Sequence, residues 1–144
     1  MRWSAALLAA TLIAPLAGCS GGDSSPSQPS SPPAPQRTLI AQGAQGDIQP
    51  ASQGTAYFLT VTAPANASLE ATVDWTSPAN QVVIAWAQGD CAANPNCSPI
   101  AQNTGTAKPK TVTATNLAAG NYTLAIANLG STPESISFQI FAIH

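Results

Sequence analysis

The chain has 144 residues, of which only 7% are charged, and its formal net charge is −2 at pH 7. The few lysines and arginines form no cluster, which argues against nucleic-acid binding because phosphate contacts need clustered basic side chains. Hydrophobic residues make up 44% of the chain, enough for one packed domain, and the Ser, Thr, Asn, Gln, Pro and Gly that accompany them favour strands and turns over helices.

Residues 1–18 are predicted to be a removable signal peptide. Arg2 precedes an apolar stretch at residues 4–17, which is too short for a comfortable membrane span. The following residues, LAGC at positions 16–19, closely resemble the bacterial lipobox. This resemblance implies cleavage before Cys19, acylation of its thiol, and membrane attachment through the lipid. By resemblance to Gram-negative lipoproteins, Ser20 favours the outer membrane if the cell envelope is Gram-negative.

Residues 19–37 are predicted to be a lipid-anchored flexible tether. The segment 20–36 reads SGGDSSPSQPSSPPAPQ and has no large apolar side chain whose burial could offset the entropy of ordering. Its prolines stiffen the second half toward polyproline II. At about 3.1 Å per residue the segment reaches on the order of 50 Å, enough to lift a domain clear of the lipid headgroups.

Residues 38–144 are predicted to form one all-β domain, a jelly-roll-like or Ig-like two-layer β-sandwich of about seven to eight strands. Short alternating runs are separated by turn residues, as expected of a sandwich. The predicted strands lie within residues 55–63, 68–76, 81–88, 111–115, 121–128 and 135–143, with a further strand or extended lead-in at 38–41 and 46–48. The aromatic residues predicted to face the core are Tyr57, Trp75, Trp86, Tyr122 and Phe138.

Two cysteines remain in the domain, at positions 91 and 97. An even pair in an exported domain indicates a structural disulfide between Cys91 and Cys97, and the intervening Asn-Pro-Asn favours a turn that would bring the sulfurs together. A metal site is the alternative, but it would need two more soft ligands, and the single histidine is the terminal His144.

Three segments resemble the bacterial pre-peptidase C-terminal domain. They are LEATVDW at residues 69–75, NQVVIAW at 80–86 and LAAGNYTLAI at 117–126, within a resemblance that covers about residues 55–140. The resemblance implies a jelly-roll-like sandwich of the kind appended to secreted proteases, with calcium-dependent collagen-binding modules among its relatives. The acidic positions that bind calcium in those relatives are Asn80 and Val83 here.

No cofactor or metal site is predicted. Asp47, Asp74 and Asp90 could each supply an oxygen to calcium, but they form no compact sequence cluster, and calcium needs six to eight oxygen ligands. Glu70 and Asp74 share one face of a strand about 13 Å apart, too far for paired-carboxylate hydrolysis. We therefore expect no catalytic residues and no enzyme activity.

The expected function is that of a non-catalytic envelope lipoprotein that presents its sandwich for protein contact or an accessory role. The alternative is an adhesion module for an extracellular polysaccharide or matrix protein. Phe58, Phe141 and Ile143 are out of phase with the core positions and are the predicted binding residues, either as a patch for a protein or as a stacking surface for sugar. The other interpretation is that they cover a second core layer or the sheet edge.

Overall fold

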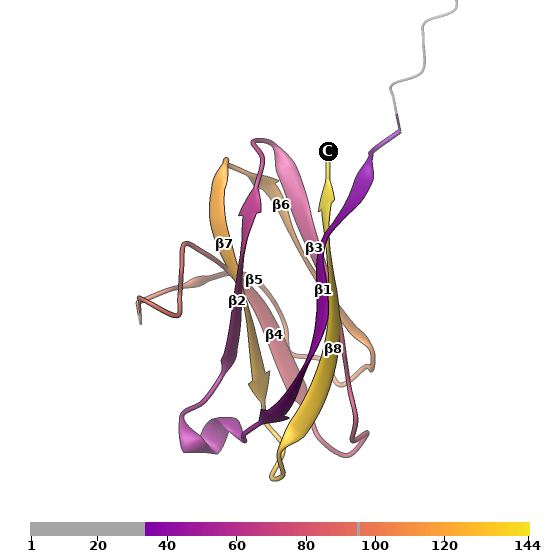
Figure 1. Ribbon diagram of the computed structural model, residues 1–144, viewed down its shortest axis with the longest axis vertical. Coiled ribbons are helices and arrows are strands. Elements are labelled where there is room, and N and C mark those ends of the chain that lie inside the picture. The colour runs from indigo at the N-terminus through magenta and orange to yellow at the C-terminus, as the bar shows by residue number, and fades with distance from the viewer. Residues whose placement is uncertain (1–33, 95) are drawn as a thin grey trace, which may run out of the picture. The chain divides into compact units, whose positions relative to one another are not determined.

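The computed structural model describes residues 34–94 and 96–144, which form two four-stranded antiparallel sheets packed face to face (Figure 1). In chain order the strands are β1 (Arg37–Ile48), β2 (Tyr57–Ala63), β3 (Ala67–Trp75), β4 (Val82–Gln88), β5 (Pro99–Asn103), β6 (Lys110–Leu117), β7 (Gly120–Asn128) and β8 (Glu134–Ile143). A single 3-10 turn, η1 (Ala51–Gln53), lies between β1 and β2. In the part of the chain that the structure describes, no helix is long and apolar enough to cross a membrane.

The strand order identifies the sandwich as a jelly roll. Sheet A has the order β1-β8-β3-β6, and sheet B has the order β2-β7-β4-β5. The chain crosses between the sheets after every strand except β4, which is followed by its neighbour β5. The predicted all-β sandwich is therefore confirmed. The predicted signal peptide, the lipidation site Cys19 and most of the predicted tether lie outside the described residues.

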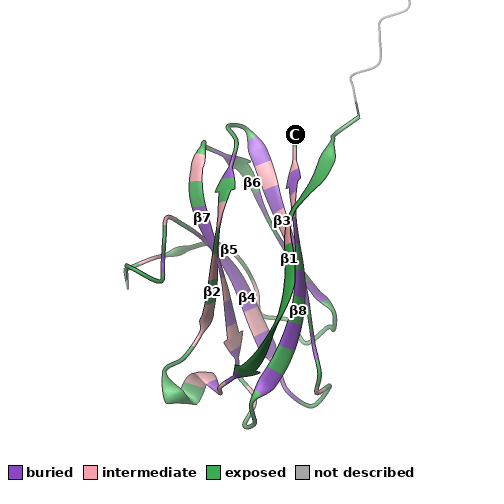
Figure 2. Cartoon of the chain, viewed as in Figure 1, coloured by how far each residue is buried: buried purple, intermediate pink, exposed green. Residues whose placement is uncertain are grey.

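The predicted inward faces form the core between the sheets. Alternate residues of β3, from Leu69 to Trp75, are buried, and the same alternation runs along β8, along most of β6 and along β7 except at Thr123 (Figure 2). Four of the five predicted core aromatics are buried, and the fifth, Tyr57, is half-buried and packs against the core. Strand β4 lies between β7 and β5, as its apolar character on both faces predicted.

Two strands differ from the prediction. The separate segments expected at 38–41 and 46–48 are parts of one twelve-residue edge strand, β1, whose Gly43 interrupts the apolar pattern. A Cβ at Gly43 would lie 3.0 Å from the ring of Phe138, so a glycine there lets the ring sit against the β1 backbone. Strand β5 was not predicted, since it is a short edge strand that begins with Pro99 and is fixed by pairing with β4.

The segment 117–122 makes a tight corner between β6 and β7. The hydroxyl of Tyr122 donates a hydrogen bond of 3.0 Å to the carbonyl of Ala118, four residues earlier. Gly120 has a φ of 156°, a value that favours glycine. This arrangement is the tyrosine corner found in other β-sandwiches, and it gives the Leu-x-x-Gly-x-Tyr sequence a structural role of its own.

Candidate functional site

The outer face of sheet A carries a shallow depression of about 570 Å³, which we call the sheet A groove. It is lined mainly by uncharged hydrogen-bonding side chains and one carboxylate. The residues that line it include Gln42, Thr72, Asp74, Pro109, Ser137 and Gln139.

Strand register explains why these side chains converge. Gln42 of β1 lies opposite Gln139 of β8, and Gln139 lies opposite Thr72 of β3. Thr72 in turn pairs with Thr111 of β6, and their hydroxyls are 2.9 Å apart. Paired residues project from the same face of a sheet, so two amides and two hydroxyls form a row across four strands.

Each of the two carboxylates on this face forms an ion pair. Arg37 Nη2 lies 2.6 Å from Glu70 Oε1, and Lys108 Nζ lies 3.0 Å from Asp74 Oδ1. Glu70 and Asp74 therefore stand on the outer face, as their strand parity predicted, each beside its own cation. The groove between these pairs presents neutral donors and acceptors rather than a pair of free carboxylates.

The three predicted binding residues do not form one patch, which corrects that part of the expectation. Phe58 is 39% exposed on β2 of sheet B, whereas Phe141 and Ile143 are half-buried on β8 of sheet A. The guanidinium carbon of Arg37 lies 3.3 Å from the centre of the Phe141 ring. Because the cation covers that ring face, Phe141 does not offer it for stacking on a sugar.

The outer face of sheet B is apolar over much of its width. Phe58 lies opposite Ala125, which lies opposite Ala85, and the neighbouring pair on the same face is Ala127 and Val83. Outer faces of antiparallel sheets are usually polar, so this row of five apolar residues distinguishes sheet B from sheet A.

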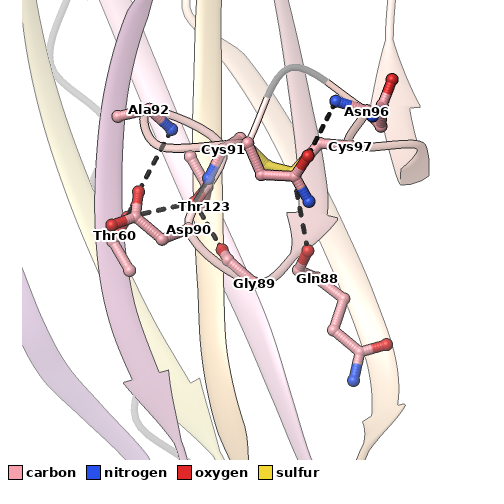
Figure 3. Close-up of a disulfide and its surroundings, with 10 residues drawn as sticks. Thr60, Gln88, Gly89, Asp90, Cys91, Ala92, Asn96, Cys97 and Thr123 are labelled. Atoms are coloured by element: carbon pink, nitrogen blue, oxygen red, sulfur yellow. Dashed lines mark hydrogen bonds between the residues drawn. A yellow bond between two sulfur atoms is a disulfide. The ribbon is translucent and has the colours of Figure 1, made fainter.

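The β4–β5 connection lies against the other part of this face, and a disulfide closes a loop within the connection (Figure 3). Cys91 and Cys97 are bonded, with their Cα atoms 5.6 Å apart, which confirms the predicted disulfide. The hydroxyl of Thr123 accepts a hydrogen bond from the Cys91 amide and donates one to the carbonyl of Gly89. Thr123 is fully buried although it points outward from β7, because this connection covers it.

The three candidate calcium ligands are dispersed. Asp74 is paired with Lys108, whereas Asp90 accepts hydrogen bonds from the Ala92 amide and the Thr60 hydroxyl. Asp47 lies near the far end of β1. Among residues 34–94 and 96–144, no three His, Cys, Asp or Glu side chains gather closely enough to hold a metal ion.

Sequence reasoning missed a buried carboxylate at the start of β8. Glu134 is 2% exposed and accepts hydrogen bonds from the amides of Thr76 and Ser77, the Thr76 hydroxyl and the Asn80 side chain. Burial alone would raise the pKa of Glu134, but these hydrogen bonds favour the charged form and hold its pKa below the ordinary value. The carboxylate thereby fixes the turn between β3 and β4.

Sequence reasoning also missed a buried lysine at the start of β6. Lys110 is 1% exposed, its ammonium donates to the carbonyl of Val82, and it lies 5.5 Å from the centre of the Trp75 ring. Burial lowers the pKa of Lys110 because it disfavours the charged ammonium. These contacts tie β6 of sheet A to β4 of sheet B and give the lysine a structural role.

No protein-family model matches the chain, and no curated protein matches it significantly. The resemblance to pre-peptidase C-terminal domains therefore stays a prediction. Among solved structures, a mitogen from Yersinia pseudotuberculosis is 13% identical with a TM-score of 0.48, covering 74% of this chain and 86% of the mitogen.

Two further structures show similar, distant likeness. The periplasmic g-type lysozyme inhibitor PliG of Aeromonas hydrophila is 14% identical, with a TM-score of 0.43 and coverage of 74% of this chain and 85% of the inhibitor. The xylan-binding module CBM15 is also 14% identical, with a TM-score of 0.42 and coverage of 78% and 86%. Likeness at this level assigns the chain neither a ligand nor a partner.

Proposed function

We propose that the chain is a non-catalytic binding module of the bacterial cell envelope, and that its sheet A groove binds a neutral polysaccharide. The observation that carries the proposal is the row of Gln42, Gln139, Thr72 and Thr111 between two ion pairs. Amides and hydroxyls both donate and accept hydrogen bonds, which matches the hydroxyl groups of an uncharged sugar. Such a surface has little to offer a strongly charged polymer.

The same residues support a binding role rather than a catalytic one. General acid–base catalysis needs a titratable group that is free to exchange a proton with the substrate. The carboxylates nearest the groove, Glu70 and Asp74, are already ion-paired, and His144 stands at the chain terminus. Binding without turnover is therefore the proposed activity.

Substitution of the two glutamines tests the groove. We expect Gln42→Ala and Gln139→Ala each to weaken binding to a recognised polysaccharide by up to about tenfold, because a net hydrogen bond contributes about 0.5–1.5 kcal/mol. Affinity electrophoresis in gels that contain xylan, mixed-linkage glucan, mannan or dextran would identify the ligand, and calorimetry would measure the loss. Gln102→Ala on β5 of sheet B is the matched control. Unchanged affinity in the Gln42 and Gln139 variants would contradict the assignment.

The envelope location rests on lipid attachment at Cys19. In a bacterial host we expect the mature chain to begin at Cys19, to carry acyl chains on it and to fractionate with membranes. Mass spectrometry of the N-terminal peptide measures the first two features, and cell fractionation measures the third. Cys19→Ser should abolish acylation and release the protein from the membrane fraction, and a membrane-bound, unacylated wild-type protein would contradict the proposal.

The apolar face of sheet B favours protein contact as a second candidate function. Phe58 is exposed beside Ala125 and Ala127, and no charged residue lies in this row. A photo-crosslinking amino acid at position 58 should capture a protein partner in intact cells, whereas the same group at position 42 should not. Efficient crosslinking from position 42 instead would place the protein contact on sheet A.

A further inference from the structure

A second surface feature lies at the end of sheet A where β1 begins. Leu39 and Ile40 are 43% and 38% exposed, and Phe141 and Ile143 beside them are half-buried. Leu39 lies directly opposite Phe141, and Arg37 lies opposite Ile143. We call Leu39, Ile40, Phe141 and Ile143 the tether-end patch.

Two of the three turns at this end of the sandwich are uncharged, whereas the third, the β4–β5 connection, carries Asp90. Residues 64–66 read Pro-Ala-Asn and residues 118–119 read Ala-Ala, all of them exposed. The Asn66 amide donates to the carbonyl of Leu117, which joins the two turns. By contrast, the buried Glu134 and Lys110 belong to the opposite end, where β8 and β6 begin.

The chain enters the domain beside the patch. Gln36 and His144 exchange backbone hydrogen bonds of 2.7 Å and 3.0 Å, so the start of the described chain lies beside the C-terminus at this end of the sandwich (Figure 1). Other exposed large apolar residues stand elsewhere, and Leu129 lies at the opposite end, in the connection from β7 to β8.

We propose that the tether-end patch rests on the surface of the lipid bilayer that holds the chain's own anchor. This inference depends on the lipid attachment at Cys19 proposed above. Seventeen residues, 20–36, separate Cys19 from Arg37, so an anchored domain stays within about 50 Å of the bilayer. The patch is small, and the anchor supplies the high local concentration that makes a weak contact effective.

The charges around the patch suit an interfacial position. Arg37 lies over the Phe141 ring and pairs with Glu70, so the charged groups can stay in the headgroup layer while the apolar stems and the aliphatic side chains face the acyl boundary. Gln139 is two residues from Phe141 along β8, about 7 Å away. The contact would therefore hold the sheet A groove close to the membrane surface.

Quenching of an introduced tryptophan tests the contact. The full chain, lipidated in a bacterial host, is reconstituted into phosphatidylcholine vesicles whose acyl chains carry bromine, a quencher of tryptophan fluorescence. Leu39→Trp places a probe in the patch, and Leu129→Trp is the matched control at the opposite end. The native Trp75 and Trp86 are buried, and their fluorescence is measured in the parent chain and subtracted.

We expect the Leu39→Trp emission to be quenched and blue-shifted, because interfacial groups insert about 5–10 Å into the headgroup boundary. The Leu129→Trp emission should be unchanged, and Ile40→Ser combined with Leu39→Trp should reduce the quenching. Equal quenching at both positions, or none at either in vesicle-bound protein, would overturn the proposal. A loss of quenching that coincides with self-association of the protein, detected by size-exclusion chromatography with light scattering, would also overturn the proposal.

Failure of the anchor is distinguishable from failure of the patch. Unlipidated protein would not float with vesicles in a density gradient, whereas lipidated protein that floats without quenching contradicts only the patch. If lipidation fails, the chain from Cys19, with Cys91 and Cys97 oxidised, can be coupled through its free thiol to a maleimide lipid. The same quenching measurement then decides whether the patch meets the bilayer.

Discussion

Replacement of Glu134 by glutamine should be among the most destabilising single-atom changes in this domain. The carboxylate is 2% exposed and accepts a 2.6 Å hydrogen bond from the Thr76 hydroxyl, a 2.6 Å bond from Asn80, and bonds from the amides of Thr76 and Ser77. Glutamine keeps one acceptor oxygen but turns the other into an NH2 group that faces donors. Hydrogen bonds to buried charged groups contribute about 1.5–3 kcal/mol each, and unsatisfied partners cost about 1–3 kcal/mol.

We therefore expect Glu134→Gln to lower the free energy of unfolding by about 2–4 kcal/mol at pH 7, or the melting temperature by roughly 10–20 °C. The pKa of Glu134 is lowered in the folded protein, so its contribution is fully present above the unfolded pKa and is lost as the pH falls through the folded pKa. The difference in the free energy of unfolding between the wild type and Glu134→Gln should accordingly narrow in acid, where the wild-type side chain is also neutral.

Urea unfolding followed by circular dichroism from pH 7 to pH 2 measures both effects. Glu70→Gln is the matched control, since it alters a partly exposed ion pair and should change stability by no more than about 1 kcal/mol. A loss at Glu134 below about 1 kcal/mol at pH 7, or a gap that stays constant into acid, would refute the assigned role of this carboxylate.

Three further changes test other parts of the structure. Cys91→Ser with Cys97→Ser should cost about 2 kcal/mol in thermal unfolding, because the disulfide closes a short loop; an unchanged melting temperature would contradict this. Tyr122→Phe should lower the free energy of unfolding by about 1 kcal/mol, because it removes the hydrogen bond to the Ala118 carbonyl. Unchanged stability would contradict a stabilising role for the tyrosine corner. Because the pKa of Lys110 is lowered in the folded protein, the wild type should become more stable as the pH rises from the folded pKa to the unfolded pKa. Lys110→Met should remove this gain, and identical profiles of stability against pH for the two proteins would contradict the prediction.

The regular part of the fold could be predicted because strand parity and core burial agree. Apolar residues alternate with polar ones throughout β3 and from Ile136 to Ile140 of β8, so the face of each strand follows directly from the sequence. Where the alternation breaks, the prediction also breaks. Gly43 interrupts β1, and Pro99 opens a five-residue β5 whose limits depend on pairing with β4.

Strand parity also contained an unused signal for the buried charges. Glu134 shares the inward parity of Ile136 and Phe138, and Lys110 shares that of Val112. A charged side chain at an inward position is tolerated only with partners, and those partners come from turns distant in the sequence. Their positions, like the covering of Phe141 by Arg37, depend on tertiary packing and could not be read from local patterns.

The two outer faces of the sandwich point to separate roles. Sheet A combines the polar groove with the tether-end patch, so a bilayer contact through the patch would turn this face toward the membrane surface. The apolar row around Phe58 belongs to the opposite sheet and would then face away, open to a protein partner. A charged residue at position 58 should therefore disturb protein contact while leaving both polysaccharide binding and lipid quenching intact. If Phe58→Asp also abolished polysaccharide binding in a stably folded protein, the two faces would not be independent, and the assignment of the ligand to sheet A would be wrong.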